Sequence, residues 1–238
     1  GVTDTSGNYN GTAQGTITYT SPGKKSINTQ GDIRSTVSAN TAAGFSIVRN
    51  TGTADYTQTL GHGLSAAPEL IIQKPIASAV DWYVLFNIDG TGGWDWGKLN
   101  SNQAFQADNP VRFSTNATTI NNWGWNTYDM INYCFHSVPG YSKIGTYEGN
   151  QSAGHSISVG FQPRFVVLKG LDAVESWIVH SAVSGMNGSS HIRWNTSGGF
   201  DNGANEAISF TSTGFSITTA GATQINTSGN TYLYWAIA

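Results

Sequence analysis

Two pairs of tryptophans stand two residues apart between residues 94 and 125: Trp94 with Trp96, and Trp123 with Trp125. In a β-strand, residues two apart lie on the same face, so each pair would present two indole rings side by side. Flat aromatic surfaces can stack against the apolar faces of sugar rings, while nearby polar groups fix the ligand's orientation. The candidate polar groups are Asp95, Asn121, Asn122 and Asn126. These positions form a candidate saccharide site.

The same tryptophans have a second interpretation that involves no ligand. Aromatic residues are enriched where protein surfaces meet, so the indoles could instead pack against the second half of the chain or a neighbouring subunit. Exposure of Trp94, Trp123 and Trp125 would favour a receptor site. Burial against other subunits would favour an architectural role.

The histidines and carboxylates do not indicate a metal or a cofactor. The five histidines are scattered along the chain: His62, His136, His155, His180 and His191. The single cysteine, Cys134, lies two residues before His136 but has no further sequence-adjacent ligand. Asp89 and Asp95 lie in a glycine-rich loop that lacks the alternating Asp pattern of a calcium loop, and turn formation explains them better. We expect no metal and no cofactor.

Catalytic motifs are missing as well. The sequence has no Gly-x-Ser-x-Gly elbow, no Gly-x-Gly-x-x-Gly and no phosphate-binding loop. A polysaccharide-degrading enzyme would need two facing carboxylates in a groove, and among fourteen acidic residues a chance pair carries little weight. We therefore expect a protein that is not an enzyme.

Composition narrows the class of protein. Charged residues make up 11% of the 238 residues, and the eleven Lys and Arg leave a formal net charge of −3. Phosphate binding needs clustered positive charge, so no nucleic-acid partner is expected. No apolar run approaches the ~18 residues of a membrane helix, so no membrane insertion is expected. Short apolar runs between Gly, Ser, Thr and Asn clusters are typical of turn-rich β proteins.

An internal repeat organises the chain. Residues 68–74 recur at 163–169, which is 95 positions further on, and the tripeptide Gly-Phe-Ser at 44–46 recurs as Gly-Tyr-Ser at 140–142. The alternating run at 131–135 likewise matches 233–237. Repeats found in the same order predict two copies of one fold.

The repeat and the strand signals together predict the architecture. We expect an all-β protein with two tandem homologous antiparallel β-sandwich domains of jelly-roll type, at 44–139 and 140–238. Segment 1–43 is poorer in apolar residues, although 15–19 and 33–37 could form strands. We interpret it as an N-terminal arm or the end of a preceding unit.

The repeat also sorts the tryptophans. Trp82 aligns with Trp177, and Trp96 with Trp194, so these four are expected in the cores. Trp94 aligns with an isoleucine, and the 123/125 pair has no tryptophan counterpart. The unshared tryptophans are therefore freer to bind a ligand.

Two stretches of the sequence are similar to a known family. One is 44–74, which contains Gly44-Phe45-Ser46 and Leu60-Gly61-His62-Gly63-Leu64, and the other is 133–145. They resemble a repeat domain of tail-fibre and virion surface proteins of marine and cyanobacterial bacteriophages. The resemblance covers 44–238. It implies lectin-like β-sandwich modules, a location on the virion surface, other virion subunits as partners and assembly as a homotrimer.

The function expected from these observations is non-catalytic. We expect a phage fibre or spike module that adsorbs to a host-surface polysaccharide by shape and aromatic stacking. The alternative is an architectural capsid or tail decoration protein that stabilises the particle through protein contacts.

Overall fold

The computed structural model describes residues 2–3, 10–11, 25–76, 79–87, 94–107, 113–122, 127–182, 186 and 188–238. Within these residues the elements are β-strands and two short 3₁₀ helices, η1 (Thr41–Ala43) and η2 (Ala204–Glu206). The prediction of an all-β protein is confirmed. In the described part of the chain no helix is long and apolar enough to cross a membrane.

An eight-stranded antiparallel sheet forms the centre of the first lobe, by which we mean residues 25–138. Its order is β10-β9-β8-β7-β12-β5-β4-β3. The strands are β3 (Ser26–Asn28), β4 (Ser35–Asn40), β5 (Phe45–Thr51), β7 (Leu70–Pro75), β8 (Tyr83–Phe86), β9 (Asp95–Lys98), β10 (Gln106–Ala107) and β12 (Asp129–Phe135). A small sheet of β6 (Thr59–Gly61) and β11 (Thr119–Asn121) contributes Leu60 and Ile120 to the same hydrophobic core.

The start of this sheet corrects one prediction. Strands β3 and β4 come from the segment expected to be an arm, and β4 pairs with β5 from Thr36 opposite Arg49 to Asn40 opposite Phe45. Val37 of β4 is buried in the lobe's core. Residues 26–40 therefore belong to the first lobe, because their alternating residues complete its sheet. Two further strands, β1 (Val2–Thr3) and β2 (Asn10–Gly11), pair with each other.

The second lobe, residues 139–238, contains a five-stranded sheet in the order β13-β20-β15-β16-β17. These strands are β13 (Ser142–Glu148), β15 (Phe165–Gly170), β16 (Ile178–Ser181), β17 (Ile192–Arg193) and β20 (Thr231–Ile237). A three-stranded sheet of β14 (His155–Ser158), β18 (Ile208–Thr211) and β19 (Gly214–Ile217) shares a core with it.

The five strands of the second lobe's large sheet match five strands of the first in order. Reversed, β17-β16-β15-β20-β13 corresponds to β9-β8-β7-β12-β5. The register corresponds as well: Val84 pairs with Gly97, and Val179, 95 residues further on, pairs with Ile192. By this register Trp194 of the second lobe is equivalent to Leu99 of the first. The alignment of Trp96 with Trp194 from sequence is therefore wrong by three residues.

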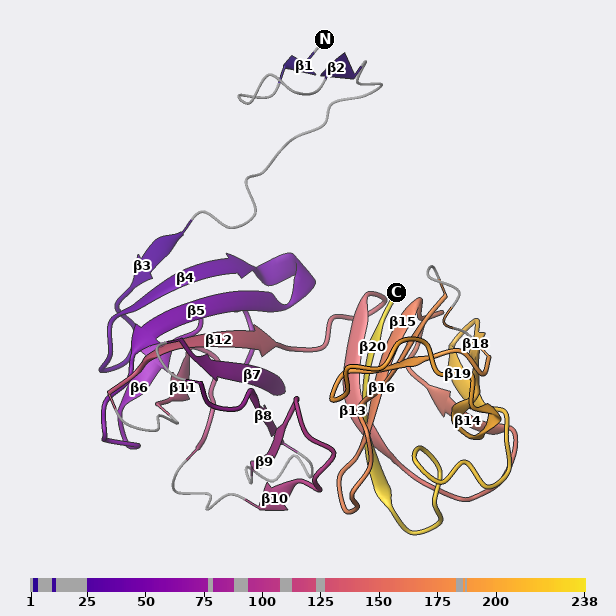
Figure 1. The fold of residues 1–238 in the computed structure, drawn as a ribbon. Helices are drawn as coiled ribbons and strands as arrows, with labels where there is room; N and C mark the ends of the chain where they lie inside the picture. The colour runs from indigo at the N-terminus through magenta and orange to yellow at the C-terminus, as the bar shows by residue number, and fades with distance from the viewer. Residues whose placement is uncertain are drawn as a thin grey trace.

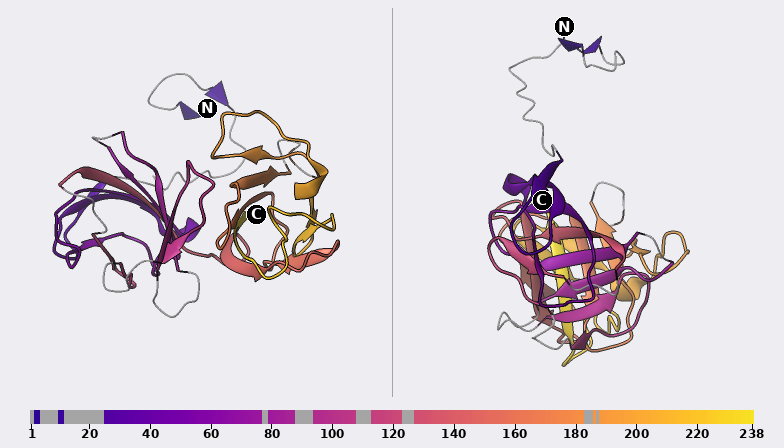
Figure 2. Two further views of the ribbon diagram at one scale, coloured as in Figure 1. Left: turned by 60° about the horizontal axis from the view of Figure 1, so that its bottom comes forward. Right: turned by 90° about the vertical axis from the view of Figure 1, so that its left-hand side faces the viewer.

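The two large sheets pack against each other face to face (Figure 1). Leu70, Val84 and Phe86 of the first lobe share a buried cluster with Trp177 and Leu233 of the second. The strands of the two facing sheets cross at a steep angle (Figure 2), as in orthogonal sheet packing. This buried cluster between the lobes holds them together, because its apolar surface is removed from water only when the lobes are in contact.

Candidate ligand-binding groove

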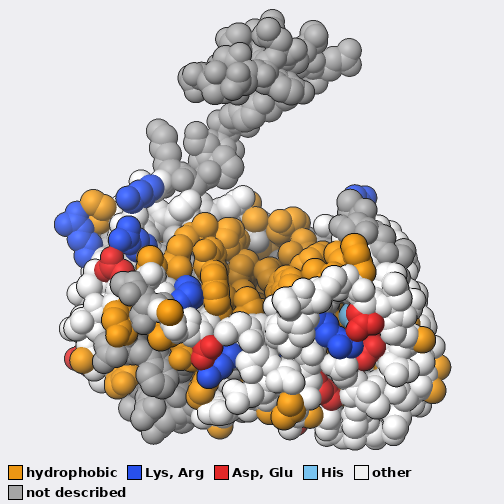
Figure 3. Space-filling model, viewed as in Figure 1, with side chains coloured by type: hydrophobic (Ala, Val, Ile, Leu, Met, Phe, Trp, Pro, Cys, Tyr) orange, Lys and Arg blue, Asp and Glu red, His pale blue; other side chains and the backbone are white. Residues whose placement is uncertain are grey.

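A groove opens where the two facing sheets diverge, next to the connection between the lobes. We call it the aromatic groove, and its volume is about 320 Å³. It is lined by Asn40, Ala43, Gly44, Phe45, Phe135, His136, Tyr141, Ser142, Trp235 and Ile237. In the space-filling view, hydrophobic side chains gather in the hollow between the lobes (Figure 3).

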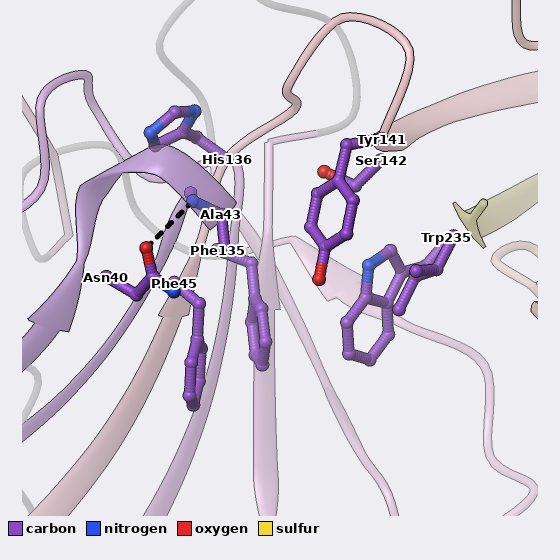
Figure 4. A pocket seen from close by; sticks show the side chains of 10 residues that line it. Asn40, Ala43, Phe45, Phe135, His136, Tyr141, Ser142 and Trp235 are labelled. Carbon is purple, nitrogen blue, oxygen red and sulfur yellow. Dashed lines mark hydrogen bonds between the residues drawn. The ribbon is translucent and has the colours of Figure 1, made fainter. Parts of the chain in front are cut away.

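Aromatic rings from both lobes form a connected row in this groove. Phe45 and Phe135 are cross-strand partners on β5 and β12, and their rings stack with centroids 4.9 Å apart. The ring of Trp235 on β20 lies 4.5 Å from that of Phe135 and 6.3 Å from that of Phe165. Tyr141 stands beside Trp235 in the close view (Figure 4) and is 44% exposed. The row therefore presents partly exposed rings to a ligand.

The backbone at the rim is held by specific contacts. Gly44, which follows η1, has φ of 64°, and a Cβ there would lie 2.5 Å from the carbonyl oxygen of His136. Only glycine combines this left-handed conformation with so close an approach. The Glu69 carboxylate accepts hydrogen bonds from the backbone N–H and the hydroxyl of Ser137 in the connection between the lobes. The Ser137 hydroxyl also accepts a hydrogen bond from the backbone N–H of Ile144 on β13 at 3.0 Å, which links the connection to the second lobe.

The polar groups of the groove are amide, hydroxyl and imidazole groups. Asn40 accepts a hydrogen bond at Oδ1 from the Ala43 N–H at 3.2 Å (Figure 4). His136 Nδ1 lies 2.8 Å from the Ser137 carbonyl oxygen, which makes this nitrogen the donor, and Nε2 lies 3.5 Å from the Ser65 hydroxyl. None of the described residues that line the groove is Lys, Arg, Asp or Glu. It therefore suits an uncharged ligand with apolar faces and hydroxyl groups.

The predicted tryptophan site lies elsewhere and is in part wrong. Trp94 is 2% exposed, and its ring packs edge-on against Phe113 with centroids 4.9 Å apart in the first lobe's core. Trp96 is partly buried, contacts Tyr83 and packs against the same core. The pair does share a face, but that face points inward, so Trp94 has no surface to offer a ligand. Asp95, between them, is half-buried.

The remaining predicted residues divide into two groups. Trp123, Trp125 and Asn126 lie outside the described residues, so their role stays a prediction. Asn121 and Asn122 have structural partners: Asn121 accepts from the Ser114 hydroxyl at 2.7 Å, and Asn122 is 1% exposed and donates to backbone oxygen.

The tryptophans expected in the cores also differ from one another. Trp177 is 3% exposed, as predicted, whereas Trp82 is 37% exposed and stacks on Tyr133 at 6.3 Å. Trp194 is half-buried between the lobes.

Sequence reasoning missed the groove residues. In the sequence Phe45 and Tyr141 stand out only as parts of the repeated tripeptide. Phe135 and Trp235 stand out only as parts of the repeated alternating runs at 131–135 and 233–237. A usable signal was present, because β12 alternates Asn132 and Cys134 inward with aromatic residues at 133 and 135 on the other face. Aromatic residues on the outward face of a central strand indicate a second packing surface.

Three ionisable groups outside the groove are buried or ion-paired. Burial raises the pKa of the Cys134 thiol to about 12, so it is not a reactive thiolate. Asp81 and Asp129 form ion pairs with Lys98 and Arg49, each at 2.8 Å. Within the described residues no three His, Cys, Asp or Glu side chains are grouped as a metal site.

The fold and the groove define a two-lobed all-β protein with an aromatic, uncharged groove at its lobe junction. The chain belongs to the family described as Domain of unknown function (DUF7483), whose model matches residues 1–238. No curated protein and no solved structure gives a significant match to the chain.

Proposed function

We propose that this protein is a non-catalytic binding module of a bacteriophage virion surface and that its aromatic groove takes a neutral saccharide of the host surface. The observation that carries the proposal is the row of rings formed by Phe45, Phe135 and Trp235 in a groove without charged side chains. Sugar rings have apolar faces for stacking and hydroxyls for neutral polar groups, so this lining fits them. The resemblance of 44–74 and 133–145 to phage fibre repeats supports the virion context.

The tandem organisation belongs to the same proposal. The matching strand order of the two large sheets supports two homologous sandwich domains produced by duplication. In this arrangement the groove is a product of the duplication, because Phe45 and Phe135 come from one copy and Trp235 from the other. Neither copy alone contains the site.

Binding of the full chain to immobilised neutral and acidic bacterial surface polysaccharides tests the proposal. We expect binding to neutral chains, and we expect Trp235→Ala to weaken it by about 1–3 kcal/mol, because stacked aromatics concentrate binding energy. Val174→Ala, which changes a 69% exposed side chain outside the groove, is the matched control and should bind as the unaltered chain does. Equal binding by Trp235→Ala and the control, or no binding to any saccharide, would refute the groove as a glycan site.

An architectural decoration protein is the second candidate. It is favoured by an exposed apolar cluster away from the groove, made of Ile76, Val80 and Trp82, which are 49%, 39% and 37% exposed. Such a cluster is typical of a protein contact.

A further inference from the structure

The second lobe carries a hydrophobic seat that a loop of the first lobe fills. The ring of Phe105 lies 6.0 Å from that of Trp177, and its backbone N–H donates to the Leu171 carbonyl at 2.8 Å. Trp177 Nε1 donates to the Lys98 carbonyl at 2.9 Å. Leu171 and Trp177 are 2% and 3% exposed. We call Leu171 and Trp177 the filled seat and Phe105 its plug.

The first lobe contains the same seat 95 residues earlier, with Ile76 and Trp82 in place of Leu171 and Trp177. Local hydrogen bonds establish the equivalence. The Trp82 N–H donates to Asn100 Oδ1 at 3.0 Å, and the Trp177 N–H donates to Asn195 Oδ1 at 2.8 Å. The two seats are therefore built alike, down to the asparagine that holds each tryptophan.

The second lobe contains the matching plug. Gln106 pairs with Trp96, and Asp201 pairs with His191, so the loops that precede these pairings are equal in length and anchored alike. Phe105 and Phe200 occupy the same place in the two loops, one residue before the pairing.

The seat of the first lobe and the plug of the second are both exposed to solvent. Phe200 is 63% exposed, and the seat residues Ile76 and Trp82 are 49% and 37% exposed. A cavity of about 200 Å³ lies beside the seat, lined by Trp82, Leu99, Asn100 and Trp194. We call Ile76 and Trp82 the open seat.

A single substitution explains why Phe200 does not pack as Phe105 does. The Phe105 ring lies directly over Gly97, where a Cβ would be 2.6 Å from its Cε2 atom. The equivalent residue in the second lobe is Ile192, which pairs with Val179 as Gly97 pairs with Val84. The isoleucine side chain fills the space that the phenylalanine ring needs, so the ring of Phe200 is left in solvent.

We propose that Phe200 of one copy of this chain inserts into the open seat of a second copy, and that the chain self-associates head to tail. The occupant follows from the filled seat, which takes a phenylalanine on a loop of the same length and anchoring. Because plug and open seat lie at different places on one chain, the contact is heterologous, and it repeats from copy to copy until the rotation between neighbours closes a ring or the assembly ends. The aromatic groove shares no residue with this contact, so the inference does not rest on the proposed saccharide function.

Sedimentation velocity of the full chain over a range of concentrations tests the inference. We expect the unaltered chain to associate with rising concentration, and Phe200→Ala and Trp82→Ala each to sediment as monomers. An equimolar mixture of the two variants should form a dimer and nothing larger, because one variant keeps the seat and the other the plug. Val174→Ala is the control and should associate normally.

Three outcomes would overturn the inference. The unaltered chain could remain monomeric at its highest attainable concentration, either variant could associate like the control, or the mixture could stay monomeric although both variants unfold at the control's temperature. A monomer in which Phe200 is protected from solvent would show instead that the plug closes on its own chain. The variants' saccharide binding reports separately on the groove.

Discussion

Lys74 and Lys169 occupy equivalent positions in the two lobes and make the same hydrogen bonds in different surroundings. Lys74 Nζ donates to the carbonyls of Pro75 and Val80 at 3.0 and 2.9 Å. Lys169 Nζ donates to the carbonyls of Gly170 and Glu175, both at 2.8 Å. The first ammonium is partly exposed and the second is fully buried.

The difference arises from the neighbouring lobe. The loop that carries Phe105 covers Lys169, and the Asn102 carbonyl of that loop lies 3.5 Å from its Nζ. Burial lowers the pKa of Lys169 to about 8. A local structure that occurs in both lobes is therefore partly exposed in one and buried in the other, where the Phe105 loop covers it.

The largest effect is expected at the two tryptophans. Trp177→Ala should lower the free energy of unfolding by about 4 kcal/mol, because it empties a packed site, whereas Trp82→Ala should cost about 1 kcal/mol or less in dilute monomer. Urea unfolding of both variants measures the difference. Similar losses would mean that the two seats are equally packed in solution and would break the comparison.

The two lysines should differ by less. Lys169→Met removes the donor that satisfies two buried carbonyl oxygens, so we expect it to cost about 2–3 kcal/mol. Lys74→Met should cost about 1 kcal/mol or less, because water can replace the donor at a partly exposed site. The same unfolding experiment applies. A larger loss for Lys74→Met would show that cover by the Phe105 loop is not what distinguishes the lysines.

The smallest effect is a pH dependence confined to the second lobe. Burial raises the pKa of Glu175 from 4.5 to about 7, while the equivalent residue in the first lobe is Val80. Below pH 4.5 both the folded and the unfolded chain hold this proton, and the contribution of Glu175 to the free energy of unfolding is fully present. As the pH rises to 7 the unfolded chain releases the proton first, so Glu175 by itself should lower the free energy of unfolding by about 2 kcal/mol. Burial lowers the pKa of His180 in the same lobe to about 4, and this group raises stability with pH over part of the same range. The contribution of Glu175 is therefore measured as a difference between variants.

Glu175→Gln should remove the Glu175 contribution, because the amide imitates the protonated acid at every pH, so between pH 4.5 and 7 its stability should rise relative to that of the unaltered chain. Thermal unfolding between pH 4.5 and 8 checks it. The Lys169 ammonium titrates at higher pH, above about 8, where its release of a proton should raise stability, so the two effects occupy separate windows. Identical pH profiles for Glu175→Gln and the unaltered chain would contradict a role for Glu175.

Much of the strand architecture was predictable from the sequence. The repeated segments 44–46, 68–74 and 131–135 overlap β5, β7 and β12. The prediction of an N-terminal arm was wrong for residues 26–40. The strands β3 and β4 are only weakly apolar and give little periodic signal, and they are positioned by pairing, β4 with β5 and β3 with β4. The candidate site at Trp94 failed because period-two spacing shows which side chains share a face and not whether that face is covered.

The sequence by itself determined the all-β class, the repeat and the face on which each strand residue lies, since pleating is a local property of the backbone. Only the tertiary structure decided which of the duplicated surfaces is buried. Trp82 and Trp177 have the same type, the same strand context and the same asparagine partner, yet they are 37% and 3% exposed. Their difference depends on Gly97 leaving room for the Phe105 ring and Ile192 leaving none for Phe200. That is a matter of packing between segments far apart along the chain, which no local pattern encodes.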